Sequence, residues 1–213
     1  MAVQSSFKNM VLCLLVICFV SSALLAVVYA VTKAPIEAAA AAKTNNAIAQ
    51  VVPAFDGAPE LSQINVAGTD YTYYKVSKDG AVAGYAIMAA ATGFSGPVSL
   101  MVGITADGII YNTSVLSQSE TPGLGAKCTE PAFADQFRNF NPAEKDLKVK
   151  KDGGDVDAIT ASTITSRAYT KAVQTALDVY RAITTGVQPD GASGASAAGT
   201  ASDTENNGGQ DNE

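Results

Sequence analysis

A long, strongly apolar segment without charges lies close to the N-terminus of the chain. Met10 to Val31 comprises 22 consecutive residues without an acidic or basic side chain. At about 1.5 Å per residue, a helix of this length spans roughly 33 Å, which is enough for the hydrocarbon core of a bilayer. We therefore expect residues 10–31 to form a transmembrane helix. A cleaved signal peptide is the alternative, but its apolar region is normally only about 7–15 residues long.

The charges on either side of this segment set its expected orientation. Lys8 and the α-amino group precede it, whereas Lys33 and Lys43 follow it and are partly offset by Glu37. We expect residues 1–9 to form a short cytoplasmic N-terminus. The rest of the chain is then expected on the outer side of the membrane.

Composition divides the remaining chain into three parts. Residues 32–55 are rich in alanine and are expected to form a helical connector, with Pro35 in its first turn and Pro53 closing it. Residues 187–213 contain almost nothing to bury and are predicted to be a disordered acidic tail. Residues 56–186 are left as the folded domain.

The overall charge and the absence of histidine restrict the possible chemistry. The chain has a formal net charge of -6 and no histidine. No basic cluster is available for the phosphates of a nucleic acid, so no nucleic-acid partner is expected. Histidine-based general bases, metal ligands and haem ligands are excluded, and the three cysteines form no CxxC pair. Any chemistry must therefore come from other groups or from a bound cofactor.

Two pairs of apolar runs separated by Asp-Gly predict two β-hairpins, because this dipeptide favours the tight turn between antiparallel strands. The runs are Tyr71–Val76 with Ala81–Ala89, and Val98–Thr105 with Ile109–Leu116. Between the hairpins lies the glycine-containing loop "TGFSGP", Thr92 to Pro97. Such loops are frequent positions for functional residues.

A long amphipathic helix is expected near the end of the domain. Apolar residues recur at helical spacing from Thr163 to Thr184, and a short helix is expected around Pro131–Phe140. The residues expected on the buried face of the long helix are Ile164, Ala168, Ala172, Ala176, Val179, Tyr180 and Ile183. The expected fold class is α+β, an antiparallel β-sheet of hairpins with packed helices, preceded by one N-terminal transmembrane helix.

Two further segments have the composition of ligand-binding loops. "ETPGLG", Glu120 to Gly125, suits a loop whose backbone closely approaches a flat ligand, although a tight surface loop is the alternative. "DAITASTITS", Asp157 to Ser166, places five hydroxyls at a helix start, where a single one suffices as a cap. A phosphate-binding helix start is the functional interpretation, because free N–H groups and the helix dipole attract an anion. Simple capping with solvated hydroxyls is the alternative.

These two segments and "GFSGPVSLMVGITADGII" together resemble the FMN-binding domain family of membrane electron-transfer complexes. The resemblance is closest to the G subunits of the Rnf ion-translocating electron transport complex. It is more distant to the C subunits of the Na⁺-translocating NADH:quinone reductase. It extends from the apolar segment to about Thr185.

In that family, a flavin transferase attaches FMN through its phosphate to the last threonine of an S/T-G-A-T-like element that follows an aspartate. Here Asp157 precedes the element Thr160, Ala161, Ser162 and Thr163. The resemblance therefore implies covalent FMN in a phosphoester with Thr163, with the hydroxyls of Thr160, Ser162 and Thr165 donating to the phosphate oxygens. Ala161 replaces the usual glycine and Ser162 the usual alanine, so that Ser162 becomes a competing hydroxyl.

The other loop is expected to face the isoalloxazine ring and the ribityl chain. Its expected cofactor contacts are Glu120, Thr121, Gly123, Leu124 and Gly125. No catalytic side chain and no metal ligand is expected, because flavin supplies the redox chemistry.

The resemblance also implies a function for the whole chain. It implies a redox subunit, an electron carrier and not a stand-alone catalyst, of an Rnf-type ferredoxin:NAD oxidoreductase complex that couples electron transfer to Na⁺ or H⁺ translocation. It implies a location in the bacterial inner (cytoplasmic) membrane, with the domain on the periplasmic or extracytoplasmic side. Its expected partners are the other membrane subunits and the flavin transferase. The alternatives are the C subunit of a Na⁺-translocating NADH:quinone reductase and a non-redox, membrane-anchored ligand-binding module.

Overall fold

The computed structural model describes residues 7–186. The expectations for residues 1–6 of the N-terminus and for the acidic tail, residues 187–213, lie outside the described residues. The chain divides into two compact units, Met1–Ala47 and Ile48–Glu213.

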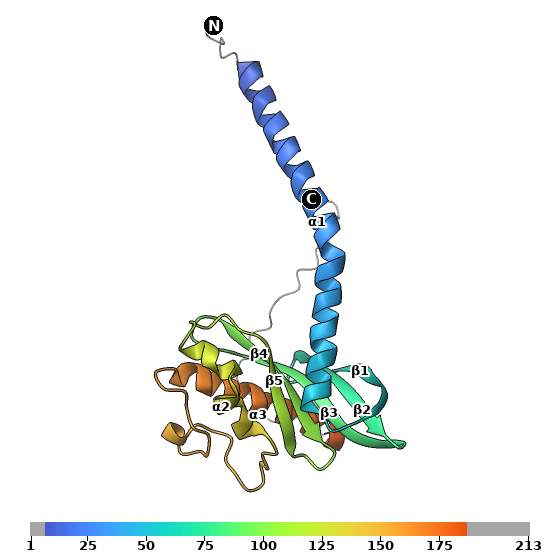
Figure 1. Cartoon of the computed structure of the whole chain (residues 1–213), viewed down its shortest axis with the longest axis vertical. Coiled ribbons are helices and arrows are strands. Elements are labelled where there is room, and N and C mark those ends of the chain that lie inside the picture. Colours follow the sequence, from blue (N-terminus) through green and yellow to red (C-terminus); the bar gives the residue numbers. More distant parts are fainter. Residues whose placement is uncertain (1–6, 187–213) are drawn as a thin grey trace, which may run out of the picture. The chain divides into compact units, whose positions relative to one another are not determined.

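The first unit is formed by most of helix α1 (Phe7–Val51), which is continuous over its whole length (Figure 1). In the described part of the chain, α1 is the one helix long and apolar enough to cross a membrane. Most of the large apolar side chains of residues 10–31 are exposed. Pro35, expected in the first turn of a second helix, lies inside α1, so that detail of the prediction is wrong. The proline removes one backbone hydrogen bond, but the alanine-rich sequence after it strongly favours continued helix.

The second unit is built on a five-stranded antiparallel sheet in which spatial order follows chain order, β1-β2-β3-β4-β5. The strands are β1 (Asp56–Val66), β2 (Thr69–Lys78), β3 (Ala81–Thr92), β4 (Pro97–Thr105) and β5 (Ile110–Ser117). Both predicted hairpins are confirmed, as β2–β3 and β4–β5. Asp79 and Gly80 both have positive φ, of 51° and 79°, as the expected tight turn requires.

Strand β1 is absent from the sequence-based prediction. Its sequence, DGAPELSQINV, contains a glycine, a proline and several polar residues, and most of its side chains are not buried. It is a strand because it forms a ladder with β2 from Glu60↔Lys75 to Val66↔Thr69. The sheet neighbour, and not local propensity, therefore decides its conformation.

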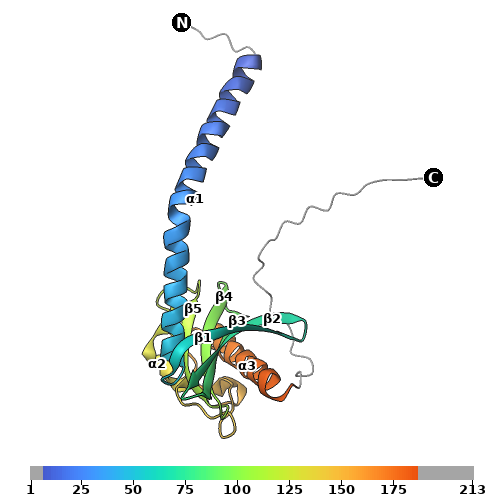
Figure 2. The ribbon, with the colours of Figure 1, turned by 90° about the vertical axis from the view of Figure 1, so that its right-hand side faces the viewer.

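Helix α3 (Thr163–Thr185) lies across one face of the sheet and packs mainly on β3 and β4 (Figure 2). The predicted long helix is thus confirmed, and so is the α+β fold class. Its buried face includes Ala168, Ala172 and Ala176 as expected, but Ile164 is half exposed, so its predicted burial is wrong. The helical spacing of apolar residues cannot show that the first turn of the helix extends beyond the packed core.

Short helical turns surround the long helix. They are α2 (Pro131–Ala134) and the 3-10 turns η1 (Gly125–Thr129), η2 (Asp135–Phe137) and η3 (Lys150–Asp152). The expected helix around residues 131–140 is therefore shorter than predicted. Tyr169 of α3 forms a buried aromatic cluster with Phe133 and Phe137. The ring centroids of Phe137 and Tyr169 are 4.8 Å apart.

The loop between β3 and β4 is a tight turn. The pairing of β3 with β4 runs without a register shift from Gly84↔Thr105 to Thr92↔Pro97. The loop between them closes with a backbone hydrogen bond of 2.8 Å from the Gly93 N–H to the Gly96 carbonyl. Phe94 and Ser95 are thereby held at the tip of this turn.

Candidate functional site

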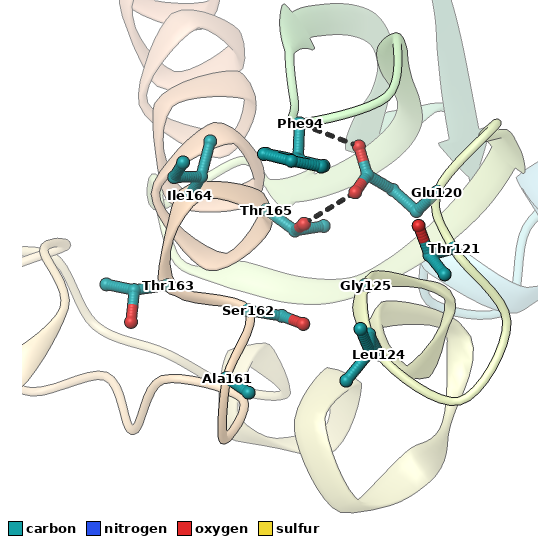
Figure 3. A pocket seen from close by; sticks show the side chains of 10 residues that line it. All are labelled: Phe94, Glu120, Thr121, Leu124, Gly125, Ala161, Ser162, Thr163, Ile164 and Thr165. Carbon is teal, nitrogen blue, oxygen red and sulfur yellow. Dashed lines mark hydrogen bonds between the residues drawn. The ribbon is translucent and has the colours of Figure 1, made fainter.

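A pocket of about 370 Å³ brings together three segments that are far apart in sequence (Figure 3). They are the β3–β4 loop, the loop that follows β5, and the start of α3. Its lining consists of Phe94, Glu120, Thr121, Leu124, Gly125, Ala161, Ser162, Thr163, Ile164 and Thr165. The volume lies within the roughly 300–1,000 Å³ that is typical of small-molecule sites.

Glu120 connects the three segments. Its side chain is only 6% exposed. Oε1 accepts hydrogen bonds from the backbone N–H groups of Phe94, at 2.8 Å, and Ser95, at 3.1 Å. Oε2 accepts a hydrogen bond of 2.7 Å from the Thr165 hydroxyl on α3. Because protein groups occupy both oxygens, Glu120 shapes the pocket.

Two glycines make room for this carboxylate. A Cβ on Gly93 would overlap Oε1 of Glu120. A Cβ on Gly125 would overlap Oε2 and would lie 2.7 Å from the Thr165 hydroxyl oxygen. The glycines of two loops thus serve one buried carboxylate.

The start of α3 has the features of an anion site. Ser162 is the N-cap residue, but its side chain makes no capping hydrogen bond, although it is only 7% exposed. Figure 3 shows its hydroxyl directed toward the Leu124 side of the pocket. The first backbone N–H groups of a helix have no partner within it and carry the positive end of its dipole. This geometry suits a phosphate group.

The five hydroxyl-bearing residues from Thr160 to Ser166 differ in their hydrogen-bond partners. Thr165 is bound to Glu120, and Ser166 donates to the Ser162 carbonyl and accepts from the Ile159 N–H. Thr163 is half-buried and accepts a hydrogen bond of 3.1 Å from Nζ of Lys151. In Figure 3 its side chain extends from the opposite side of the ribbon to Ser162.

Three large apolar side chains form exposed walls around the pocket. Phe94 is 71% exposed, Leu124 43% and Ile164 50%. Among the described residues of the second unit, Leu61 is the one other large apolar side chain that is comparably exposed. Each of the three walls comes from a different segment of the pocket (Figure 3). Apolar walls with a few polar groups between them are typical of sites for flat organic ligands.

Three of the residues predicted for cofactor binding lie outside the pocket lining. Thr160 and Gly123 are exposed. Asp157 is also exposed and forms an ion pair of 2.8 Å with Lys150, while its backbone N–H donates to Oε1 of Gln136. Asp157 therefore fixes the loop that leads into α3.

Two lining residues, Phe94 and Ile164, are missing from the predicted site. Phe94 carries a signal in the sequence, since it is an aromatic residue between glycines in a turn. Ile164 carries none, because its spacing matches that of the buried residues of the helix.

Burial favours the neutral forms of two groups in the core of the domain, the Cys128 thiol and the Tyr169 phenol. Burial, and then the negative charge of Glu120, raise the pKa of the Cys128 thiol to about 11. Burial raises the pKa of Tyr169 to about 12, and the Tyr169 hydroxyl lies 2.8 Å from that of Thr113. No cluster of His, Cys, Asp or Glu that could hold a metal ion occurs among residues 7–186. The one carboxylate in the pocket lining, that of Glu120, is bound by donors of the protein itself.

The part of the chain that forms the pocket matches a known protein family. Residues 93–178 match the family described as the FMN-binding domain, and this range includes all three segments of the pocket. Two solved structures also resemble part of the chain. NqrC of Shewanella oneidensis is 23% identical, with a TM-score of 0.43, and the match covers 52% of this chain and 56% of that one. The C subunit of the Na⁺-translocating NADH-quinone reductase of Parabacteroides distasonis is 21% identical, with a TM-score of 0.45, and the match covers 64% of this chain and 79% of that one.

Curated relatives match over much more of the chain. The G subunit of the ion-translocating oxidoreductase complex of Methanosarcina acetivorans is 35% identical over 85% of this chain and 98% of its own length. The G subunit of the proton-translocating ferredoxin:NAD(+) oxidoreductase complex of Clostridium ljungdahlii is 30% identical over 81% of this chain and 91% of its own length. The G subunit of the Na(+)-translocating ferredoxin:NAD(+) oxidoreductase complex of Acetobacterium woodii is 36% identical over 62% of this chain and 67% of its own length. The chain therefore belongs to the family of G subunits of ion-translocating oxidoreductase complexes, and it contains their FMN-binding domain.

Proposed function

We propose that this chain is a membrane-anchored electron-transfer subunit that carries FMN in a phosphoester with Thr163. In this proposal it works in an Rnf-type ferredoxin:NAD oxidoreductase complex that couples electron transfer to Na⁺ or H⁺ translocation. Family membership and the names of the relatives support the type of complex. The single observation that carries the cofactor assignment is the pocket, which joins a helix start rich in hydroxyls to three exposed apolar walls.

The start of α3 fits the phosphate end of FMN. Ser162 offers a hydroxyl that makes no capping bond, and the first turn of the helix offers unpaired N–H groups. The dipole at a helix N-terminus favours a negative charge by about 0.3–1 kcal/mol. These groups would hold the phosphate next to Thr163.

The commitments of the hydroxyls favour Thr163 as the attachment residue. Thr165 and Ser166 are buried and bound to other protein groups. Thr160 lies outside the pocket lining. Ser162 remains as the competing hydroxyl, as the sequence suggests. Thr163 combines a place in the lining, partial exposure and the position expected for the attachment residue.

The three walls fit the isoalloxazine ring. Phe94, Leu124 and Ile164 would contact its faces and exclude water there. Thr121 and the backbone at Gly125 would be close enough to bond polar atoms of the ring or the ribityl chain. Bound FMN supplies the oxidation and reduction, while the protein orients it and sets its surroundings.

The membrane anchor completes the proposal. Residues 10–31 of α1 would hold the domain on the outer side of the membrane, next to the other subunits of the complex. A flavin transferase on that side would load Thr163. Because both the flavin and the domain are tethered, electron exchange with neighbouring subunits takes place at a high effective concentration.

Intact-mass spectrometry tests the attachment. The full chain, expressed with a flavin transferase, should gain the mass of one FMN minus water and keep its yellow colour after denaturation. Thr163→Ala should lose both properties, and the matched variant Ser162→Ala should keep them. An unmodified wild-type chain under these conditions would refute the proposal and favour the non-redox ligand-binding module. A Thr163→Ala variant that still gains the mass would move the attachment to another hydroxyl.

A further inference from the structure

We propose that Lys151 is the positioning residue and counter-charge for the phosphodiester on Thr163. This inference rests on the proposed function, because it concerns the group that Thr163 is to carry. No motif in the sequence indicates such a role for Lys151. The structure places its ammonium group, from the η3 turn, against the start of α3.

Lys151 contacts an uncharged side chain at the start of α3. Nζ of Lys151 donates a hydrogen bond of 3.1 Å to Oγ1 of Thr163, which is a neutral group. The two neighbours of Lys151 are already paired. Lys150 forms an ion pair with Asp157, and Asp152 accepts two hydrogen bonds from Arg167. Within the described part of the chain, Nζ of Lys151 has no carboxylate at ion-pair distance, so the ammonium group is available to pair with an anion at Thr163.

The η3 turn is fixed on both sides. Asp152 accepts hydrogen bonds of 2.7 and 2.6 Å from Nε and Nη2 of Arg167, four residues after Thr163 on α3. On the other side, the Lys150 N–H donates to the Val156 carbonyl at 2.8 Å. A bidentate pair of this kind fixes orientation as well as distance. Lys151 is therefore held close to Thr163 by the residues on either side of it.

The charges balance when Thr163 is esterified. A phosphodiester carries one negative charge on its two non-bridging oxygens, and Lys151 supplies one positive charge. The phosphate would lie between the N–H groups of α3 and the ammonium group, because Oγ1 already faces Lys151. Before attachment, the same ammonium group donates to the Thr163 oxygen and holds it in place. Lys151 thus takes the place that the resemblance assigns to nearby hydroxyls.

The test compares Lys151→Gln with Lys148→Gln in the full chain in detergent, loaded by a flavin transferase. Lys148 is a matched control, because it is an exposed lysine of the same loop that pairs with Asp146 at 3.1 Å. Intact mass over time should show loading about threefold slower in Lys151→Gln, as expected for the loss of one solvent-accessible charge contact. Lys148→Gln and Lys151→Arg should load like the wild type. The threefold difference should shrink in high salt.

The phosphorus-31 resonance of the loaded protein decides the question. It should move in Lys151→Gln and stay unchanged in Lys148→Gln. A loss of loading in Lys151→Gln alone, with normal loading in Lys151→Arg, would also support the proposal. If Lys151→Gln is loaded and its resonance equals that of the wild type, the proposal is refuted, whatever the loading rate. If the wild type itself gains no flavin, the proposed function fails instead.

Discussion

Ala161 occupies a backbone conformation that normally favours glycine. Its φ is 61°, in the left-handed region, directly before the N-cap of α3. A residue with a Cβ costs about 1–2 kcal/mol there. The resemblance expects a glycine at this position, and the backbone provides a physical reason for it.

Replacing Ala161 by glycine should therefore stabilise the domain. Relief of strain is offset by about 0.4–1 kcal/mol from the greater freedom of glycine in the unfolded chain. We expect the free energy of unfolding to rise by about 0.5 kcal/mol, measured by denaturation of the unloaded chain. Ala143→Gly, at an exposed loop position without positive φ, should lower it. A loss of stability in Ala161→Gly would contradict the assigned conformation.

Cys128 should be unreactive in the folded protein. Its side chain is fully buried, and its pKa of about 11 leaves roughly 1% thiolate at pH 9. With Cys13 and Cys18 replaced by serine, iodoacetamide should leave the native chain unmodified at pH 9 and modify it after unfolding. Mass spectrometry reads out the result. Rapid alkylation of the native protein would show that the thiol is accessible.

At the scale of elements, one carboxylate keeps the pocket together. Glu120 satisfies two N–H groups of the β3–β4 loop and one hydroxyl of α3. Removing an acceptor leaves buried donors unpaired, at about 1–3 kcal/mol. Neither segment bonds directly to the other through these groups, so their common position depends on Glu120.

Glu120→Ala should thus loosen the β3–β4 loop. We expect faster hydrogen exchange at the amides of Phe94 and Ser95 and a fall of about 2–3 kcal/mol in the free energy of unfolding. Thr165→Val is the matched control, because it removes only the bond from α3. It should cost about 1 kcal/mol and leave both amides protected. Unchanged exchange of the two amides in Glu120→Ala would mean that other contacts hold the loop.

The elements differ in how far the sequence could predict them. The hairpins and α3 were predictable because Asp-Gly turns and helical spacing are local signals. Strand β1 was not, since its pairing with β2 determines it. The two loops of the pocket were found from their hydroxyls and glycines. Ile164 and Lys151 were missed because their roles depend on where α3 and the η3 turn meet the pocket.

At the scale of the whole molecule, the exposed walls of the pocket suit a carrier. Phe94, Leu124 and Ile164 remain well exposed, so a bound ring would not be enclosed by this chain alone. An electron carrier has to bring its cofactor close to donors and acceptors on other subunits. A stand-alone catalyst usually excludes water with a closed site. The open pocket therefore agrees with the proposed role.

The proposed role also requires the domain to lie on the outer side of the membrane. Lys8 and the α-amino group immediately precede the apolar segment, and positive charges close to a span tend to stay inside. The long, acidic remainder of the chain can cross regardless of its charge. Flavin loading of Thr163 would then occur outside.

Single-cysteine labelling tests this orientation. In a chain without its native cysteines, Ala143→Cys lies in an exposed loop of the domain, and Ser6→Cys precedes the apolar segment in the sequence. A membrane-impermeant maleimide applied to intact spheroplasts should label Ala143→Cys and spare Ser6→Cys. After permeabilisation both should react, because the maleimide then reaches both sides of the membrane. The reverse pattern in intact spheroplasts would place the domain in the cytoplasm, where an outer-side transferase could not reach Thr163.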